Sequence, residues 1–108
     1  MNTLEHAEAY TPLIHSSTML LVQFGSHTCA PCTAIMQKID SWCAEHPVCR
    51  SIYVPVEQFR ELAAGESVFS VPTVLVYIEG RVTIRESGYF SLEEIFNRME
   101  RYIALLQD

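Results

Sequence analysis

Two short apolar stretches on either side of a helical stretch constrain the fold of this chain more than any other feature. Residues 19–24 (MLLVQF) are apolar almost throughout, a pattern typical of a strand buried inside a parallel sheet. Between residues 30 and 46 the apolar side chains recur at three- and four-residue steps, which predicts an amphipathic helix. Residues 48–54 (VCRSIYV) have the pattern of a second strand. A strand–helix–strand unit favours parallel pairing of the two strands through a crossover.

A predicted hairpin adds an antiparallel edge to this unit. Residues 71–78 and 81–87 both have strand patterns, and the short turn at Glu79–Gly80 joins them. So short a turn requires antiparallel neighbours, whereas the crossover unit requires parallel ones. The predicted fold class is therefore α/β, a mixed central sheet with helices on both faces, in a single domain over residues 1–108.

Three further segments have helical patterns. Residues 4–15 place apolar side chains roughly on one face, although Pro12 interrupts the segment. Residues 56–64 are predicted to form a short helix. Ser91 with Glu94 three residues later forms a capping box, which predicts the start of a final helix.

Composition excludes several classes of function. The chain has 108 residues, 13 acidic and 7 basic side chains and a net charge of −6, which argues against a binder of nucleic acids or anionic membranes. The N-terminal residues do not resemble a secretory signal, and the apolar runs are too short to cross a membrane. We therefore expect a cytoplasmic protein with no nucleic-acid or membrane partner. We also expect it to be a monomer, although neither composition nor charge decides its oligomeric state. Three acidic side chains are expected to form a solvated acidic face: Glu57, Glu61 and Glu66.

Cys29 and Cys32, separated by Ala30 and Pro31, lie where a predicted strand ends and a helix begins. Cysteines three residues apart at a helix start can come within disulfide range. Unpaired N–H groups and the helix dipole favour negative charge there, and the thiolate is the reactive form of cysteine. Pro31 limits the freedom of the loop. The expected chemistry is thiol–disulfide exchange, in which Cys29 attacks a substrate disulfide and the more buried Cys32 then releases the reduced substrate.

Two other interpretations of this pair stay open, namely ordinary buried cysteines and half of a zinc site. Zinc needs four ligands, but Cys43 and Cys49 have the wrong spacing and the four histidines form no compact pair. We expect no metal. Cys43 shares a helical stripe with Cys32 and is expected to be an inert core cysteine. The sequence identifies no role for Cys49, and a Cys43–Cys49 disulfide is disfavoured in a reducing cytosol.

The segments FGSHTCAPC, SVPTVLVYIEG and ESGY follow one another in the order and near the spacing found in thioredoxins. From Met19 onward the chain resembles that family. The resemblance implies a thioredoxin-like fold whose N-terminal strand is shortened or absent. It also implies that Cys29 is the nucleophile and Cys32 the resolving cysteine of a redox-active disulfide. No bound cofactor is implied. The implied partners are protein disulfide substrates and a separate thioredoxin reductase or other electron donor, in a role in cell redox homeostasis.

The resemblance gives roles to residues distant in sequence from the cysteines. Pro72 matches the family's cis-proline, which faces the CxxC segment; the alternative is a trans proline at the start of a strand. Val71 matches the residue that offers its backbone to the substrate, and Gly88 matches a glycine that leaves the docking surface flat. The other supporting positions lie beside the cysteines: Thr28, Ala30 and Pro31.

The chain departs from the family pattern at three positions. Thr28 stands where thioredoxins carry a tryptophan, Gln23 where they carry a buried acid, and Tyr53 where they carry a lysine. Gln23 cannot take a proton, so the resolving step is expected to be slower or to use water or another base. The alternative function is a thioredoxin-fold binding or adaptor module whose CxxC is a redox sensor or an inactive relic. The missing acid and tryptophan favour that alternative, and the intact CxxC with Pro72 and Gly88 opposes it.

Overall fold

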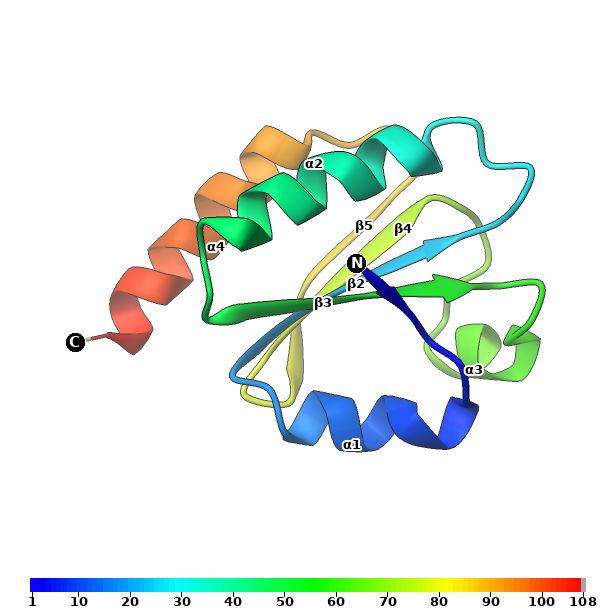
Figure 1. Ribbon diagram of the computed structural model, residues 1–108, viewed down its shortest axis with the longest axis horizontal. Helices are drawn as coiled ribbons and strands as arrows, with labels where there is room; N and C mark the ends of the chain where they lie inside the picture. The colour runs from blue at the N-terminus through cyan, green and yellow to red at the C-terminus, as the bar shows by residue number, and fades with distance from the viewer. Residues whose placement is uncertain (108) are drawn as a thin grey trace.

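The computed structural model describes residues 1–107, which form a five-stranded sheet covered by helices on both faces (Figure 1). The order of strands across the sheet is β1-β3-β2-β4-β5. β1 and β2 both run parallel to β3, β4 runs antiparallel to β2, and β5 runs antiparallel to β4. The predicted mixed sheet is confirmed. The strands have these bounds: β1 Asn2–Thr3, β2 Met19–Gly25, β3 Cys49–Pro55, β4 Thr73–Ile78 and β5 Arg81–Ser87.

Helices α2 and α4 cover one face of the sheet, and α1 and α3 cover the other (Figure 1). Among residues 1–107 no helix is both long and apolar enough to span a membrane. The helical segments have these bounds: the 3-10 turn η1 Ala7–Ala9, α1 Tyr10–His15, α2 Cys32–Ala44, α3 Arg60–Gly65 and α4 Leu92–Leu106.

The central strand β2 separates two apolar cores. All its residues are buried, as the apolar run predicts. Successive side chains of a strand point to opposite faces, so Leu20, Val22 and Phe24 pack with the α1 and α3 side. Met19 and Leu21 pack with the α2 and α4 side. Residue 23 therefore faces α2, and this alternation delivers its side chain to the CxxC segment.

The N-terminal strand is short, as the resemblance implied. β1 has only two residues, which pair with Ile52 and Tyr53 of β3. The next residue, Leu4, donates its backbone N–H to the Tyr53 carbonyl at 2.8 Å and is buried. The prediction of a helix over 4–15 was therefore wrong at its start, because residues 2–4 extend the sheet instead.

Pro12 is compatible with α1 because it is the third residue of that helix, where an N–H would have no helical acceptor. The predicted helix over 56–64 also starts late, at Arg60. Val56 instead donates its N–H to the Gly25 carbonyl at 2.9 Å, and residues 56–59 turn away from β3.

Two prolines fix the boundaries of elements at the site. The first residue of α2 is Cys32, so Pro31 is the N-cap and not part of the first turn. β4 begins at Thr73, one residue after Pro72, which has no N–H to contribute to a ladder. At the start of α4, the Ser91 hydroxyl accepts the Glu94 N–H at 3.1 Å, so the predicted cap is confirmed.

Candidate active site

Cys29 and Cys32 form a disulfide where the loop after β2 enters α2, with Cα atoms 5.4 Å apart. Two backbone hydrogen bonds of 3.2 Å shape this loop: Cys29 donates to the Ser26 carbonyl, and Cys32 donates to the Cys29 carbonyl. Cys32 is only 3% exposed, whereas Cys29 is half-buried. Cys29 is therefore the residue of the pair that an incoming molecule can reach.

The start of α2 favours negative charge beside these sulfurs. The N-cap residue is Pro31, and no side chain caps the first turn. The first N–H groups of a helix have no partners within the helix, and together with the helix dipole they stabilise an anion near that end. Since a thiolate is the reactive form of cysteine, this end of α2 supports nucleophilic sulfur chemistry.

A groove of about 630 Å³ lies on the outer side of Cys29. The groove lies between the CxxC loop and the residues that directly precede β4 and α4. These residues are distant from the loop in the sequence. Seven of the eight residues expected at the site line the groove: Thr28, Cys29, Ala30, Pro31, Val71, Pro72 and Gly88. The eighth, Cys32, lines a different cleft behind the disulfide.

The Val71–Pro72 segment forms the wall of this groove opposite Cys29. The Val71–Pro72 peptide bond is cis. Within residues 1–107 the backbone of Val71 makes no backbone hydrogen bond, whereas Pro72 accepts the N–H of Gly88 at 3.0 Å. Gly88 has φ of +75°, a conformation that favours glycine, and a Cβ there would meet only open space. The Val71 N–H and C=O are therefore available to a bound chain.

Two aromatic side chains flank this wall, and the sequence interpretation missed both. Phe69 is 82% exposed and precedes Val71 by two residues. Tyr89 is fully exposed, follows Gly88 and lines the groove. Phe69 lines a neighbouring pocket, which shares Thr28 and Val71 with the groove. Exposed aromatic side chains at adjoining hollows are typical of an interaction surface. Their position directly beside the predicted proline and glycine was the signal that could have identified them.

Gln23 connects β2 to the CxxC segment through a side-chain hydrogen bond. Its side chain is fully buried, and its amide Nε2 donates to the Cys32 carbonyl at 2.9 Å. Its other amide atom, Oε1, has no hydrogen-bond partner within residues 1–107. Gln23 therefore positions the first residue of α2, but an amide cannot take a proton from its sulfur.

Tyr53 lies beside the buried sulfur. It pairs in register with Gln23 on the neighbouring strand, and its side chain crosses over Gly25. A Cβ at residue 25 would collide with the Tyr53 hydroxyl and would lie 2.9 Å from Cys32 Sγ. Glycine is required at residue 25 because these two side chains occupy the space that a Cβ would take.

The cleft behind the disulfide has a volume of about 350 Å³. Besides both cysteines and Tyr53, its lining includes two further titratable residues, His27 and Glu57. Burial, and then the nearby Glu57 carboxylate, raise the pKa of Tyr53 above its usual value. Tyr53 therefore presents a neutral hydroxyl to this cleft at physiological pH.

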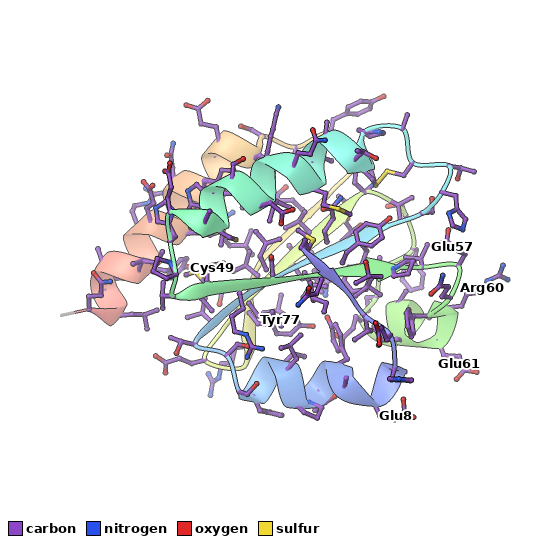
Figure 2. All side chains as sticks on the ribbon, viewed as in Figure 1. Glu8, Cys49, Glu57, Arg60, Glu61 and Tyr77 are labelled. Atoms are coloured by element: carbon purple, nitrogen blue, oxygen red, sulfur yellow. A yellow bond between two sulfur atoms is a disulfide. The ribbon has the colours of Figure 1, made fainter. Side chains whose placement is uncertain are left out.

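The expectation of a solvated acidic face was wrong for two of its three residues. Glu57 is half-buried: its Oε2 accepts the His27 N–H at 3.1 Å, and its Oε1 is buried without a partner within residues 1–107. Glu66 accepts a hydrogen bond from the Tyr77 hydroxyl at 3.2 Å. Glu61 is exposed, as expected (Figure 2). The turn after β3 brings Glu57 back to the CxxC loop, which sequence spacing could not reveal.

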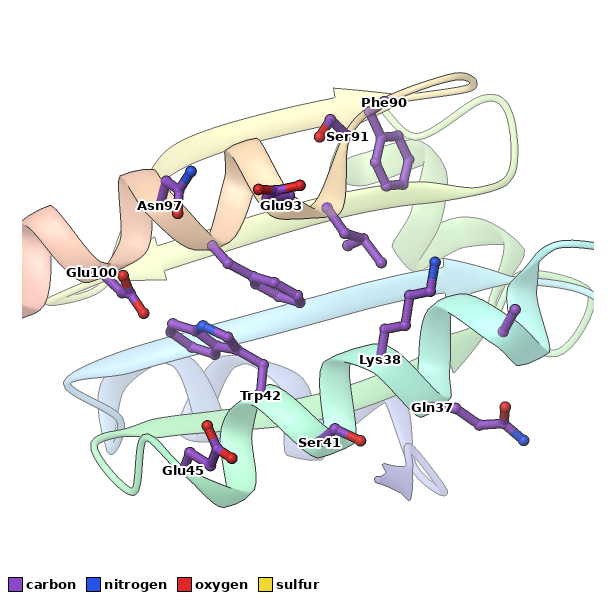
Figure 3. A pocket seen from close by; sticks show the side chains of 13 residues that line it. Gln37, Lys38, Ser41, Trp42, Glu45, Phe90, Ser91, Glu93, Asn97 and Glu100 are labelled. Atoms are coloured by element: carbon purple, nitrogen blue, oxygen red, sulfur yellow. The ribbon is translucent and has the colours of Figure 1, made fainter.

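A wider groove of about 860 Å³ lies between α2 and α4, and none of the cysteines lines it (Figure 3). Trp42 stacks there against His46 and Phe96, with ring centroids 3.8 and 4.9 Å away, so it is an aromatic on the face of α2. Across residues 1–107 no group of three or more His, Cys, Asp and Glu side chains is placed to hold a metal ion.

Comparison with known proteins identifies relatives of this chain. The family model described as thioredoxin matches residues 2–101. Thioredoxin-2 of Pyricularia oryzae is 29% identical over 80 residues, which cover 74% of this chain but only 47% of that protein. The chain thus spans about half the length of that relative.

Solved structures show the same fold. The X-ray structure of Fasciola hepatica thioredoxin is 30% identical, with a TM-score of 0.80, and the match covers 91% of this chain and 98% of that one. A structure of Plasmodium falciparum thioredoxin has a TM-score of 0.83 at 20% identity, covering 91% of this chain and 98% of that one. At that identity the likeness concerns the fold alone.

Proposed function

The chain belongs to the thioredoxin family, and on that premise we propose that it is a thiol–disulfide oxidoreductase that reduces protein disulfides with Cys29 and Cys32. The observation that carries this proposal is the groove that Cys29 shares with Val71. It combines a reachable sulfur with backbone groups that can pair with an extended chain. A binding module without redox function would not need both on one surface.

The substrate we propose is an extended segment of a protein that contains a disulfide. Such a segment pairs with the free backbone of Val71, in the manner of a strand added at a sheet edge. Tyr89 contacts its apolar side chains within the groove, and Phe69 contacts them in the neighbouring pocket beyond Val71. Because Gly88 has no side chain, the substrate sulfur has room to approach Cys29.

The proposed reaction starts from the reduced dithiol. The Cys29 thiolate attacks one sulfur of the substrate disulfide, so that a mixed disulfide forms and the other substrate sulfur leaves as a thiolate that takes up a proton. The Cys32 thiolate then attacks Cys29 Sγ, which closes the Cys29–Cys32 disulfide and releases the second substrate thiol. Two electrons pass from the dithiol to the substrate. A separate thioredoxin reductase or other thiol donor returns them.

Tyr53 and Glu57 are the groups we propose for the proton of Cys32. The thiol must lose this proton before it attacks, and Gln23 has no site for it. The neutral Tyr53 hydroxyl lies beside the sulfur and can donate a hydrogen bond to the Cys32 thiolate, which stabilises that form. Glu57 is the carboxylate of the same cleft and can accept the proton through water.

The competing proposal is a thioredoxin-fold binding or adaptor module whose CxxC serves as a sensor. Gln23 and Thr28 favour it, since both differ from the residues that thioredoxins use. We favour the oxidoreductase because Cys29, Val71 and Gly88 lie on one groove. The compartment we propose for it is the cytoplasm.

Turnover distinguishes the two proposals. The assay measures reduction of insulin disulfides with dithiothreitol as the electron donor. We expect the parent chain to raise the rate at least about tenfold above dithiothreitol alone, and Cys29→Ser to abolish the increase. Cys43→Ser serves as the matched control, because it removes a thiol without touching the groove. A parent rate equal to that of dithiothreitol alone would support the adaptor module.

A further inference from the structure

Cys43 and Cys49 form a second pair of thiols that the proposed reaction does not use. Both are free, and their sulfurs lie 3.6 Å apart in a thiol–thiol hydrogen bond. Cys43 is in the last turn of α2, the helix whose first residue is Cys32. Cys49 begins β3, at the end of that strand opposite Glu57 (Figure 2). The pair is therefore separated from the CxxC segment by the length of α2.

The surroundings make the two thiols unequal. Cys49 is only 6% exposed, whereas Cys43 is half-buried and reachable from solvent. The hydrogen bond with Cys49 lowers the pKa of Cys43, and the Ser51 hydroxyl adds to this, against burial and the Asp40 carboxylate. The same contact with Cys43, together with burial, raises the pKa of Cys49. Cys43 is thus the thiol that a small oxidant reaches first, and Cys49 is the thiol held inside the core.

We propose that Cys43 and Cys49 are a second redox-active dithiol, which a small hydroperoxide such as hydrogen peroxide oxidises to a disulfide. The sulfurs must approach by roughly 1.5 Å to reach bonding distance. Cys43 lies at the end of a helix, next to a connecting loop, while Cys49 is anchored in the core beside Met19. The movement therefore falls on Cys43, and the core stays in place.

The oxidation takes two balanced steps. The Cys43 thiolate attacks one peroxide oxygen, the O–O bond breaks, and Cys43 becomes a sulfenic acid while the released hydroxide takes a proton to give water. Cys49 then attacks the Cys43 sulfur, the S–O bond breaks, and the hydroxyl leaves as water with the proton of Cys49. The two thiols lose two electrons and two protons, and hydrogen peroxide becomes two waters.

The test uses the full chain carrying Cys29→Ser and Cys32→Ser, so that Cys43 and Cys49 are its only thiols. The reduced protein is treated with hydrogen peroxide, alkylated with iodoacetamide and cleaved with trypsin. Cleavage after Lys38 and Arg50 places both cysteines in the single peptide 39–50. We expect this peptide to become unalkylated and two hydrogens lighter, and dithiothreitol to restore alkylation.

Single substitutions in this background test the assigned roles. With Cys49→Ser, or Cys49→Ala if the serine variant does not fold, Cys43 should stop at the sulfenic acid and react with dimedone. With Cys43→Ser, oxidation of Cys49 should be at least about tenfold slower. The proposal is overturned if peroxide converts Cys43 to a sulfinic acid without a disulfide, leaves both thiols alkylatable, or oxidises Cys49 equally fast without Cys43. None of these outcomes depends on insulin reduction.

Discussion

At the scale of single residues, the buried amide of Gln23 joins β2 to the first residue of α2 by a hydrogen bond of 2.9 Å. Gln23→Asp should be less stable than the matched Gln23→Asn, because burial disfavours a charged carboxylate. Burial raises the pKa of such an aspartate above about 4, its value in the unfolded chain. The two variants should therefore unfold alike below about pH 4, and the aspartate variant should lose about 1–3 kcal/mol as pH rises to about 8. Urea unfolding at several pH values measures this, and a constant difference would show that residue 23 is not desolvated.

Tyr53 provides the second prediction at this scale. If its hydroxyl stabilises the Cys32 thiolate, Tyr53→Phe should slow the resolving step about tenfold. The step is followed as release of thionitrobenzoate from its mixed disulfide with Cys29. Alkylation of Cys29 by iodoacetamide should keep its rate. Tyr77→Phe is the control, since Tyr77 packs on the opposite face of the sheet. Equal release rates in parent and Tyr53→Phe would exclude the proposed role.

At the scale of elements, a buried network ties α1 and α3 to β4. The Tyr10 and Tyr77 hydroxyls are hydrogen-bonded at 2.8 Å, and Tyr77 also donates to Glu66 at 3.2 Å. Tyr77→Phe should cost about 1–3 kcal/mol, because it leaves the buried Tyr10 hydroxyl unpaired. Tyr10→Phe should lower the free energy of unfolding by less, because the Tyr77 hydroxyl keeps its hydrogen bond to Glu66. A double-mutant cycle by urea unfolding should give a coupling of about 1 kcal/mol, and additive losses would contradict the network.

The sequence predicts elements well where the signal is local. The run over 19–24, the crossover helix and the Ser91 cap are all visible in neighbouring residues, and all are present. The start of α1 was wrong because Leu4 hydrogen-bonds to Tyr53, which is distant in the sequence. The position of Tyr53 in the same cleft as Cys32 was missed for the same reason. It depends on the register between β2 and β3, which no short window of sequence contains.

At the scale of the whole molecule, the buried tyrosines predict alkaline instability. Burial, and then the charge of Glu66, raise the pKa of Tyr77 to about 12, against the opposing effect of its hydrogen bond with Tyr10. Burial, together with the contact with Tyr77, raises the pKa of Tyr10 further. In the unfolded chain both ionise near about pH 10. A raised pKa in the folded state contributes stability that is full below the unfolded value and is lost as pH rises toward the folded one.

The contribution of Tyr10 and Tyr77 to the free energy of unfolding should therefore stay nearly constant up to about pH 10 and fall as pH rises from about 10 to 12. The double variant Tyr10→Phe and Tyr77→Phe should lose stability less steeply over that interval. Tyr89→Phe, which changes a fully exposed tyrosine, should follow the parent. If the free energy of unfolding fell equally steeply with pH in the parent and the double variant, the raised pKa values of Tyr10 and Tyr77 would be contradicted.

The central claim, that Cys29 attacks substrates and Cys32 resolves the product, is tested most directly by trapping the mixed disulfide. Reduced Cys32→Ser and Cys29→Ser proteins are each mixed with a disulfide-bonded model protein, quenched with acid and separated without reductant. Because Cys29 is the reachable residue and Cys32 is only 3% exposed, Cys32→Ser should accumulate a covalent complex linked through Cys29, and Cys29→Ser should accumulate none. A complex formed by Cys29→Ser through Cys32, or by neither variant, would contradict the account.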